Sequence, residues 1–152
     1  MKKKDLVALG HALSGAAALI ASIVTKGQIG IPEQPIKVIG YVIFSFGCLF
    51  YIYSLLFLRG AFTGNVDPVS KNLVIGGPYR VVRHPLYLAM LVMCLGLAVG
   101  LRSWTGIALT IIVFFPSAVY RARLEEVALH DRFGEGWKAY RDCTRFIIPY
   151  LY

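Results

Sequence analysis

The chain has 152 residues, of which 57% are apolar and 16% are charged, and its formal net charge is +8. An average soluble domain is about 45–50% apolar and about 25% charged, so this chain has too few charges to cover a water-facing surface. The same numbers exclude a disordered chain, which needs low hydrophobicity and high charge. In a soluble protein the basic excess would suggest nucleic acid, whereas in a hydrophobic one it indicates loops facing anionic lipid. We therefore expect a single membrane domain, residues 1–152, that contacts the lipid bilayer and no nucleic acid.

Four apolar stretches, taken in chain order, predict transmembrane helices at about residues 6–24, 36–58, 86–101 and 104–120. A helix needs about 20 residues to cross roughly 30 Å of hydrocarbon, so the last two stretches are short. The tight turn at Arg102 and Ser103 between them predicts an antiparallel hairpin. The predicted fold class is all-α: an integral membrane bundle of four transmembrane helices with a cytoplasmic C-terminal amphipathic segment.

The start of the chain, a methionine and three lysines before an apolar run, also resembles a signal peptide. We interpret it as the first span, because the run exceeds the usual core of about 7–15 residues and three further spans follow.

The positive charges orient these spans. With the N-terminus in the cytoplasm, thirteen of the sixteen Lys and Arg residues lie on the cytoplasmic side, and only Lys26, Lys37 and Arg102 lie on the other. This asymmetry follows the positive-inside rule and places both termini and the 59–85 loop in the cytoplasm. We expect a multi-pass protein of the plasma (inner) membrane of a prokaryote.

The central parts of the four predicted spans contain no Asp, Glu, Lys or Arg. Ion carriers and small drug exporters usually carry such a residue at membrane depth, so the sequence argues against both classes. His11 is the one imidazole within a span, and we interpret it as an interfacial histidine rather than a proton relay. Cys48, Cys94 and Cys143 show no paired or metal-ligand spacing, so we expect free thiols and no metal site.

A first polar cluster runs from Gly76 to Tyr87, with the sequence GGPYRVVRHPLY. Pro85 suits the first turn of the third span, which places Arg83 and His84 just before a helix N-terminus. Tyr87 follows one helical step inside. The alternative interpretation is an ordinary interfacial girdle of arginine and tyrosine at the lipid headgroups.

A second cluster, Tyr120 to Glu126, continues the fourth span into a helix that we expect to end near Phe133-Gly134. Glu125 has the spacing to pair with Arg121 along that helix, whereas Glu126 points about 100° away. Half of the eight acidic residues lie between positions 125 and 135, close to a membrane surface that repels them. Such carboxylates are expected to bind something, for example a ribose diol or a cation.

The last stretch alternates aromatic and charged residues over 133–141 and becomes apolar over 146–152. This pattern predicts an amphipathic segment on the headgroups, followed by a tail that packs against the bundle. A plain membrane-surface helix is the alternative.

The two clusters together resemble a known family. The order of its elements is Gly77-Pro78-Tyr79, Arg83-His84-Pro85-x-Tyr87, a short transmembrane hairpin, Glu125-Glu126, Phe133-Gly134, Tyr140 and Pro149. This pattern, over about residues 72–150, resembles the isoprenylcysteine carboxyl methyltransferases, within the wider group of integral-membrane phospholipid methyltransferases. Each element alone is unspecific, and their order and spacing carry the resemblance.

The resemblance implies a methyltransferase that takes its methyl group from S-adenosylmethionine and passes it to a hydrophobic or lipid-like acceptor: a carboxylate, an amine or a thiol. Glu125 and Glu126 would hold the ribose or amino-acid part of the cofactor, and His84, Tyr87 and Leu88 would line its pocket. Arg83 and Arg145 would orient an anionic group of the acceptor. The chain departs from the family pattern at Ala89, Trp137 and Cys143, which puts the acceptor in doubt and leaves the cofactor site intact.

Two other classes of protein stay open from the sequence. A membrane reductase resembling the steroid reductases would have similar C-terminal helices and would use a nicotinamide cofactor, but six or more spans would be expected. A non-catalytic four-helix membrane protein would use its cytoplasmic charges for topology alone.

Overall fold

The computed structural model describes residues 3–30, 32–58 and 73–148. Within these ranges the fold is all-helical, without strands. Residues 59–72 of the predicted cytoplasmic loop and Pro149 of the family pattern lie outside the described residues.

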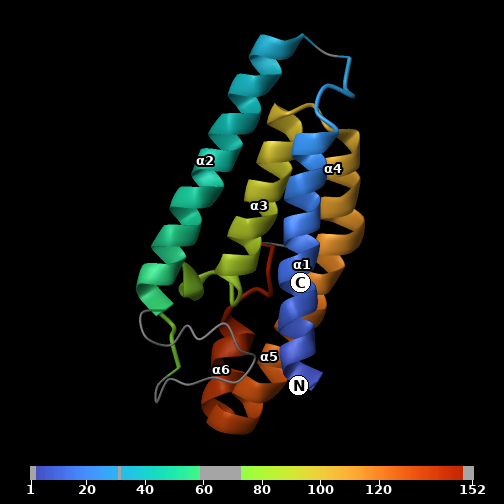
Figure 1. Cartoon of the computed structure of the whole chain (residues 1–152). Coiled ribbons are helices and arrows are strands. Elements are labelled where there is room, and N and C mark those ends of the chain that lie inside the picture. Colours follow the sequence, from blue (N-terminus) through green and yellow to red (C-terminus); the bar gives the residue numbers. More distant parts are fainter. Residues whose placement is uncertain (1–2, 31, 59–72, 149–152) are drawn as a thin grey trace.

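The helices run up and down in an elongated bundle, and the turn η2 and helix α6 lie at one end of it (Figure 1). α1 packs against α3, α4 and α5, whereas α2 packs mainly against α3 at the edge of the bundle. The start of α1 lies at the same end as α6 (Figure 1). The elements are α1 (Lys3–Val24), α2 (Glu33–Leu58), η2 (Gly77–Arg80), α3 (Pro85–Gly100), α4 (Trp104–Leu109), η3 (Thr110–Phe114), α5 (Phe115–Phe133) and α6 (Glu135–Cys143).

Three helical stretches are long and apolar enough to cross a membrane: 5–24, 33–58 and 104–133. They confirm the prediction of an all-helical protein and supply three candidate membrane-spanning helices. The predicted span 86–101 corresponds to α3, whose 16 residues rise about 24 Å and fall short of the roughly 30 Å of hydrocarbon.

α4, η3 and α5 follow one another without a break, so the helix that begins at Trp104 continues to Phe133 and carries the second polar cluster on its last turns. Pro116 lacks an N–H and crowds the preceding turn, and the helix widens into the π-turn η3 just before it. Gly134, with φ of 52°, ends α5 where the sequence predicted. The predicted tight turn before α4 is also confirmed, and the Ser103 side chain accepts a hydrogen bond from the Gly106 N–H at 2.9 Å.

Glycines allow α2 and α3 to approach closely. A Cβ atom added at Gly40 would lie 2.1 Å from the backbone nitrogen of Gly100, and one added at Gly96 would lie 2.5 Å from the backbone nitrogen of Phe44. Backbone contact through small residues is a common way for helices to associate in lipid.

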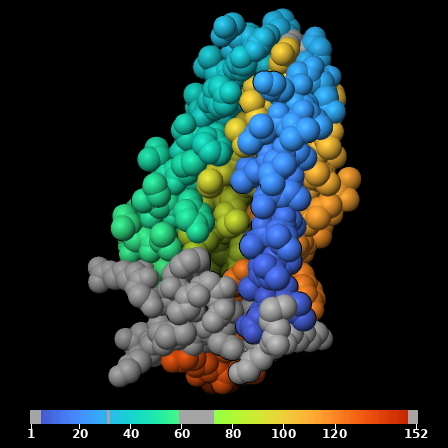
Figure 2. All heavy atoms as spheres, in the orientation of Figure 1, coloured from blue at the N-terminus to red at the C-terminus, as the bar shows by residue number. Residues whose placement is uncertain are grey.

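The outward side of α2 carries large apolar side chains. Between α1 and α2, parts of α3 reach the surface of the molecule (Figure 2). An apolar surface of this extent suits lipid and not water. The exposed residues on α2 include Val42, Phe46, Leu49, Ile52 and Leu56.

All three cysteines are free thiols: Cys94 is buried, Cys48 is half-buried and Cys143 is exposed. Within the described ranges no group of three or more His, Cys, Asp or Glu residues is placed to hold a metal ion.

Candidate functional site

The stretch before α3 and the stretch after α6 lie side by side and are joined by backbone hydrogen bonds. The Arg83 N–H donates to the Arg145 carbonyl at 2.8 Å, and the Arg145 N–H donates to the Val81 carbonyl at 2.9 Å. The His84 N–H continues the series to the Phe146 carbonyl at 3.2 Å. The C-terminal stretch is thereby fixed across the end of the bundle, where the first cluster lies.

Arg83 binds Glu126 of α5 at the centre of this end. Its Nε donates to Oε1 of Glu126 at 2.6 Å, and the two side chains are only 8% and 10% exposed. Its Nη1 donates to the carbonyls of Thr144 at 2.6 Å and Arg141 at 3.1 Å. One guanidinium, just before α3, therefore connects α5 and the end of α6 through charge-assisted hydrogen bonds.

Glu125 is held by two donors on the same oxygen. The Tyr87 hydroxyl donates to Oε1 at 2.5 Å, and the Arg121 Nε donates to it at 3.2 Å. The predicted pairing of Arg121 with Glu125 along the helix is thus confirmed. The other oxygen, Oε2, lies 3.7 Å from Nδ1 of His84, which is beyond hydrogen-bond distance and leaves that oxygen capacity to accept.

The His84 ring, in a residue that is 6% exposed, lies between the two carboxylates. Its Nε2 lies 3.5 Å from Oε1 of Glu126, is buried, and has no hydrogen-bond partner among the described residues. The Phe146 ring packs edge-on against the imidazole, with 5.2 Å between ring centroids. Buried polar atoms are usually paired, and the polar groups nearest to the two ring nitrogens are the carboxylates of Glu125 and Glu126.

The structure brings together five of the seven residues that the resemblance singled out: Arg83, His84, Tyr87, Glu125 and Glu126. The other two take peripheral positions. Leu88 is half-buried and packs against the small core beneath the site, and Arg145 contributes its backbone while its side chain is exposed.

Two members of this cluster were not predicted from the sequence. Arg123 donates to Oε2 of Glu126 at 3.4 Å, and its guanidinium lies 4.1 Å from the centroid of the Phe146 ring. The spacing of three residues between Arg123 and Glu126 is a signal for the first contact. Phe146 gives no such signal, because only the chain reversal after α6 carries it to α3.

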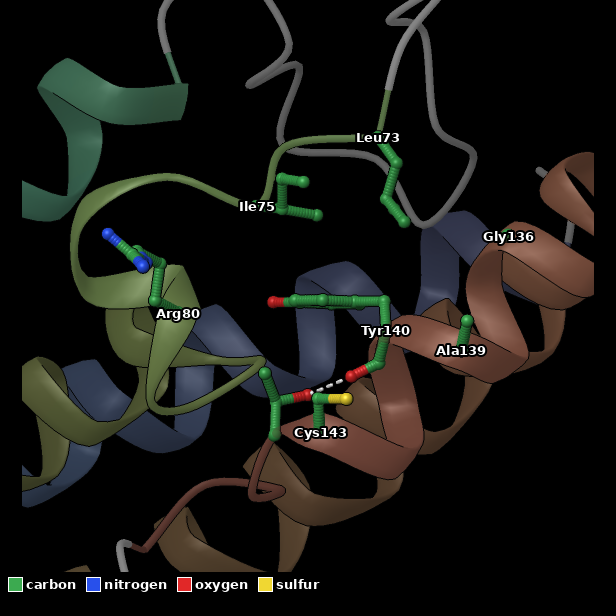
Figure 3. A pocket seen from close by; sticks show the side chains of 8 residues that line it. Leu73, Ile75, Arg80, Gly136, Ala139, Tyr140 and Cys143 are labelled. Carbon is green, nitrogen blue, oxygen red and sulfur yellow. Dashed lines mark hydrogen bonds between the residues drawn. The ribbon is translucent and has the colours of Figure 1, made fainter.

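Beside the cluster, Tyr140 of α6 donates a hydrogen bond to the Tyr79 carbonyl of η2 at 2.7 Å. A hollow of about 500 Å³ opens between α6 and the segment that leads into η2 (Figure 3). Thr144 lines this hollow and also supplies a carbonyl to Arg83, so the hollow adjoins the ionic cluster. Its lining residues are Leu73, Ile75, Arg80, Gly136, Ala139, Tyr140, Cys143 and Thr144.

Replacing Tyr140 by phenylalanine tests the hydrogen bond to Tyr79. Burial raises the pKa of Tyr140 above its ordinary value, so at neutral pH the hydroxyl is protonated and donates. We expect Tyr140→Phe to lower the free energy of unfolding by about 1 kcal/mol at pH 7. Above pH 10 the unfolded chain loses the tyrosine proton first, so it holds fewer protons than the folded chain, and the stability of the wild type falls as pH rises.

Thermal unfolding in detergent at several pH values from neutral to alkaline measures both effects. The variant should lose stability less steeply than the wild type above pH 10. Parallel curves for the two proteins would contradict the role given to the Tyr140 hydroxyl.

Long apolar helices, with a buried cluster of acidic and basic side chains at one end, define a membrane protein that has a polar site at the edge of its bundle. The family model described as phospholipid methyltransferase matches residues 36–136, well over half of the chain. The chain therefore belongs to the phospholipid methyltransferase family, which includes the isoprenylcysteine carboxyl methyltransferases. This match confirms the resemblance found in the sequence.

One curated relative is phosphatidylethanolamine N-methyltransferase B of Dictyostelium discoideum. It is 32% identical over 95 residues, which are 59% of this chain and 48% of the relative. The chain thus spans about half the length of the relative that it matches. α1, most of α6 and the whole C-terminal stretch after it lie outside the matched family region.

Proposed function

We propose that the protein is an S-adenosylmethionine-dependent methyltransferase that acts on a hydrophobic or lipid-like acceptor at the cytoplasmic face of the membrane. The observation that carries the proposal is the pair Glu125–Glu126, held against His84 and Tyr87 at one end of an apolar bundle. Family membership supplies the reaction class. The name of the relative favours an amine as the acceptor group among the three that the sequence left open.

The donors and acceptors of the cluster suit this cofactor. S-adenosylmethionine carries hydroxyl and ammonium donors and a sulfonium cation, and Oε2 of Glu125 has capacity to accept from such groups. The His84 ring lies between the two carboxylates, with Nδ1 facing Oε2 of Glu125 and Nε2 facing Glu126. When bound, the cofactor would supply the methyl group as an electrophilic carbon. Tyr87 and Leu88 would line its pocket.

The hollow beside the cluster offers room for part of a ligand of this kind. Small-molecule sites have volumes of about 300–1,000 Å³ and mostly apolar walls with a few polar groups. The hollow of about 500 Å³ falls in this range, and Thr144 links it to the Arg83–Glu126 pair. An extended ligand would reach from the hollow toward the carboxylates.

The protein residues act by positioning rather than by acid–base chemistry, since methyl transfer is an in-line displacement. Arg83 fixes Glu126, and Tyr87 fixes Glu125, so both carboxylates are oriented before a ligand arrives. The exposed Arg145 is proposed to orient an anionic group on the acceptor, whereas Arg83, which is buried against Glu126, acts by fixing that carboxylate. The apolar bundle next to the site would keep water from the reaction and admit the acceptor from the bilayer.

The topology forms part of the proposal. With four crossings, of which α3 is the short third one, both chain ends and the site would lie on the cytoplasmic side of a prokaryotic plasma membrane. The excess of Lys and Arg on the predicted cytoplasmic side supports that orientation. α6 and the stretch after it would then lie at the headgroups.

Calorimetric titration of the purified protein in detergent tests the cofactor assignment. We expect S-adenosylmethionine to bind the wild type, and Glu125→Gln to weaken that binding by about tenfold or more, because a neutral amide attracts a cation less than a carboxylate does. Glu135→Gln is the matched control: Glu135 is an exposed carboxylate at the start of α6, paired with Lys138, and its amide variant should bind like the wild type.

The same titration with NADPH separates the alternative classes. Binding of NADPH without S-adenosylmethionine would favour the reductase, and binding of neither would favour the non-catalytic protein. Equal affinity of Glu125→Gln and wild type for S-adenosylmethionine would overturn the site while leaving the reaction class intact.

A further inference from the structure

His11 of α1 is a buried polar side chain that the proposed function does not use. The residue is 4% exposed, and its Nε2 has no hydrogen-bond partner among the described residues. Leaving a polar atom unpaired in an apolar interior costs free energy, so an aliphatic side chain would be expected at a position that only fills space. The sequence predicts an interfacial histidine near the cytoplasmic end of the span, and the structure encloses its ring between helices.

Hydroxyl groups of α1 and α5 fix the orientation of this ring. Nδ1 of His11 lies 3.1 Å from the Ser117 hydroxyl, and the Ser14 hydroxyl lies 2.7 Å from the same oxygen. The Phe114 ring packs on one side of the imidazole, with 5.0 Å between ring centroids. The imidazole is therefore held by one nitrogen, and the rest of the ring is left for packing.

That packing meets the proposed cofactor site. The His11 and Tyr87 rings are 5.2 Å apart in an edge-to-face arrangement, and the Tyr87 hydroxyl is the group that donates to Glu125. A second link runs from Arg121, the other donor to Glu125, to the Ala8 carbonyl of α1 at 3.5 Å. Both donors that orient Glu125 thus contact α1, although α1 precedes the matched family region.

We propose that His11 is a positioning residue for the cofactor site, and that its ring holds the Tyr87 phenol in place so that Tyr87 stays hydrogen-bonded to Glu125. The effect of His11 on cofactor binding rests on the proposed function, whereas the contact between His11 and Tyr87 does not. Ring contact, rather than the polar link to Ser117, carries the effect, because it is the ring that touches Tyr87. The serine hydroxyls serve to orient that ring.

Two substitutions separate these contributions. His11→Asn keeps an amide that can reach Ser117 but removes the ring from Tyr87. His11→Phe keeps a ring of similar size, loses the polar link, and suits the apolar surroundings well enough to keep the protein folded. Positioning through Tyr87 predicts that Asn is the more harmful change, whereas a polar link between helices predicts that Phe is.

The first readout needs no ligand. In protein labelled with ¹³C at the tyrosine Cζ, the Tyr87 signal is identified by its absence in Tyr87→Phe, and Glu125→Gln marks its position when the carboxylate partner is lost. We expect His11→Asn to move the Tyr87 signal toward that position, and His11→Phe to leave it close to the wild type. His130→Asn, a change at an exposed histidine of α5, is the control and should leave the signal in place.

The second readout is the affinity for S-adenosylmethionine, which we expect to fall about tenfold in His11→Asn and to change little in His11→Phe. A Tyr87 signal that stays unchanged in His11→Asn, or that moves only in His11→Phe, would overturn the proposal. A signal that moves as expected in a protein that binds no S-adenosylmethionine would instead overturn the proposed function and leave the His11–Tyr87 coupling standing.

Discussion

Glu126→Ala is expected to lower the free energy of unfolding by about 3 kcal/mol, the largest effect of any single change at the site. The Arg83 and Glu126 side chains are 8% and 10% exposed, and removal of the carboxylate leaves a buried guanidinium without its counter-ion. We expect the low end of the range measured for buried pairs, because Arg83 keeps the carbonyls of Arg141 and Thr144 as acceptors. Thermal or denaturant unfolding in detergent measures the loss.

Glu135→Ala is the matched control for this prediction. Glu135 pairs with Lys138, but its side chain is 85% exposed, and exposed ion pairs contribute little to stability. Combining Arg83→Met with Glu126→Met should destabilise the protein by less than the sum of the two single changes, since no charge then stays buried alone. Equal unfolding curves for Glu126→Ala and Glu135→Ala would contradict the burial of the pair.

Gly40→Ala is expected to destabilise the bundle by about 2 kcal/mol or more, because it adds a methyl group where two helix backbones touch. The new Cβ would lie 2.1 Å from the nitrogen and 2.2 Å from the Cα of Gly100. Backbone atoms cannot rotate away as a flexible side chain does, so α2 and α3 must move apart along their contact. The melting temperature in detergent, together with the yield of folded protein, reports the effect.

Gly10→Ala is the corresponding control in a helix. A Cβ at Gly10 would meet no atom within 4 Å, and alanine favours the helix over glycine by roughly 0.5–1 kcal/mol. We expect this variant to be as stable as the wild type or slightly more stable. Destabilisation by Gly10→Ala similar to that of Gly40→Ala would contradict the close approach of α2 and α3.

Helix positions were largely predictable from the sequence because apolar composition and local turn signals are contained in neighbouring residues. The predicted spans 6–24 and 36–58 correspond to α1 and α2, and Pro85 and Gly134 mark helix boundaries as expected. The apolar span was predicted to end at 120 and its helix to continue to about Phe133-Gly134, and the helix that begins at Trp104 does end at Phe133. Charged residues stop an apolar pattern but do not stop a helix, so the end of this helix was predicted from its glycine cap and not from composition.

Local sequence spacing predicted the contacts of the site that lie within one helix, but not those between distant segments. The pairing of Arg121 with Glu125 follows from a spacing of four residues on one helix. The binding of Arg83 to Glu126 joins residues 43 apart in sequence, and no local spacing selects that partner. The sequence offered Arg83 as a residue for the acceptor, and the structure places its guanidinium on Glu126.

By itself the sequence determined that the protein is helical, apolar and a member of a membrane methyltransferase family, because these properties depend on composition and on the order of short motifs. Only the tertiary structure decided which groups meet. The backbone bonds between Arg83 and Arg145 bring Phe146 to His84, and the packing of α1 brings His11 to Tyr87. Such contacts depend on how distant segments are packed together, which no window of neighbouring residues records.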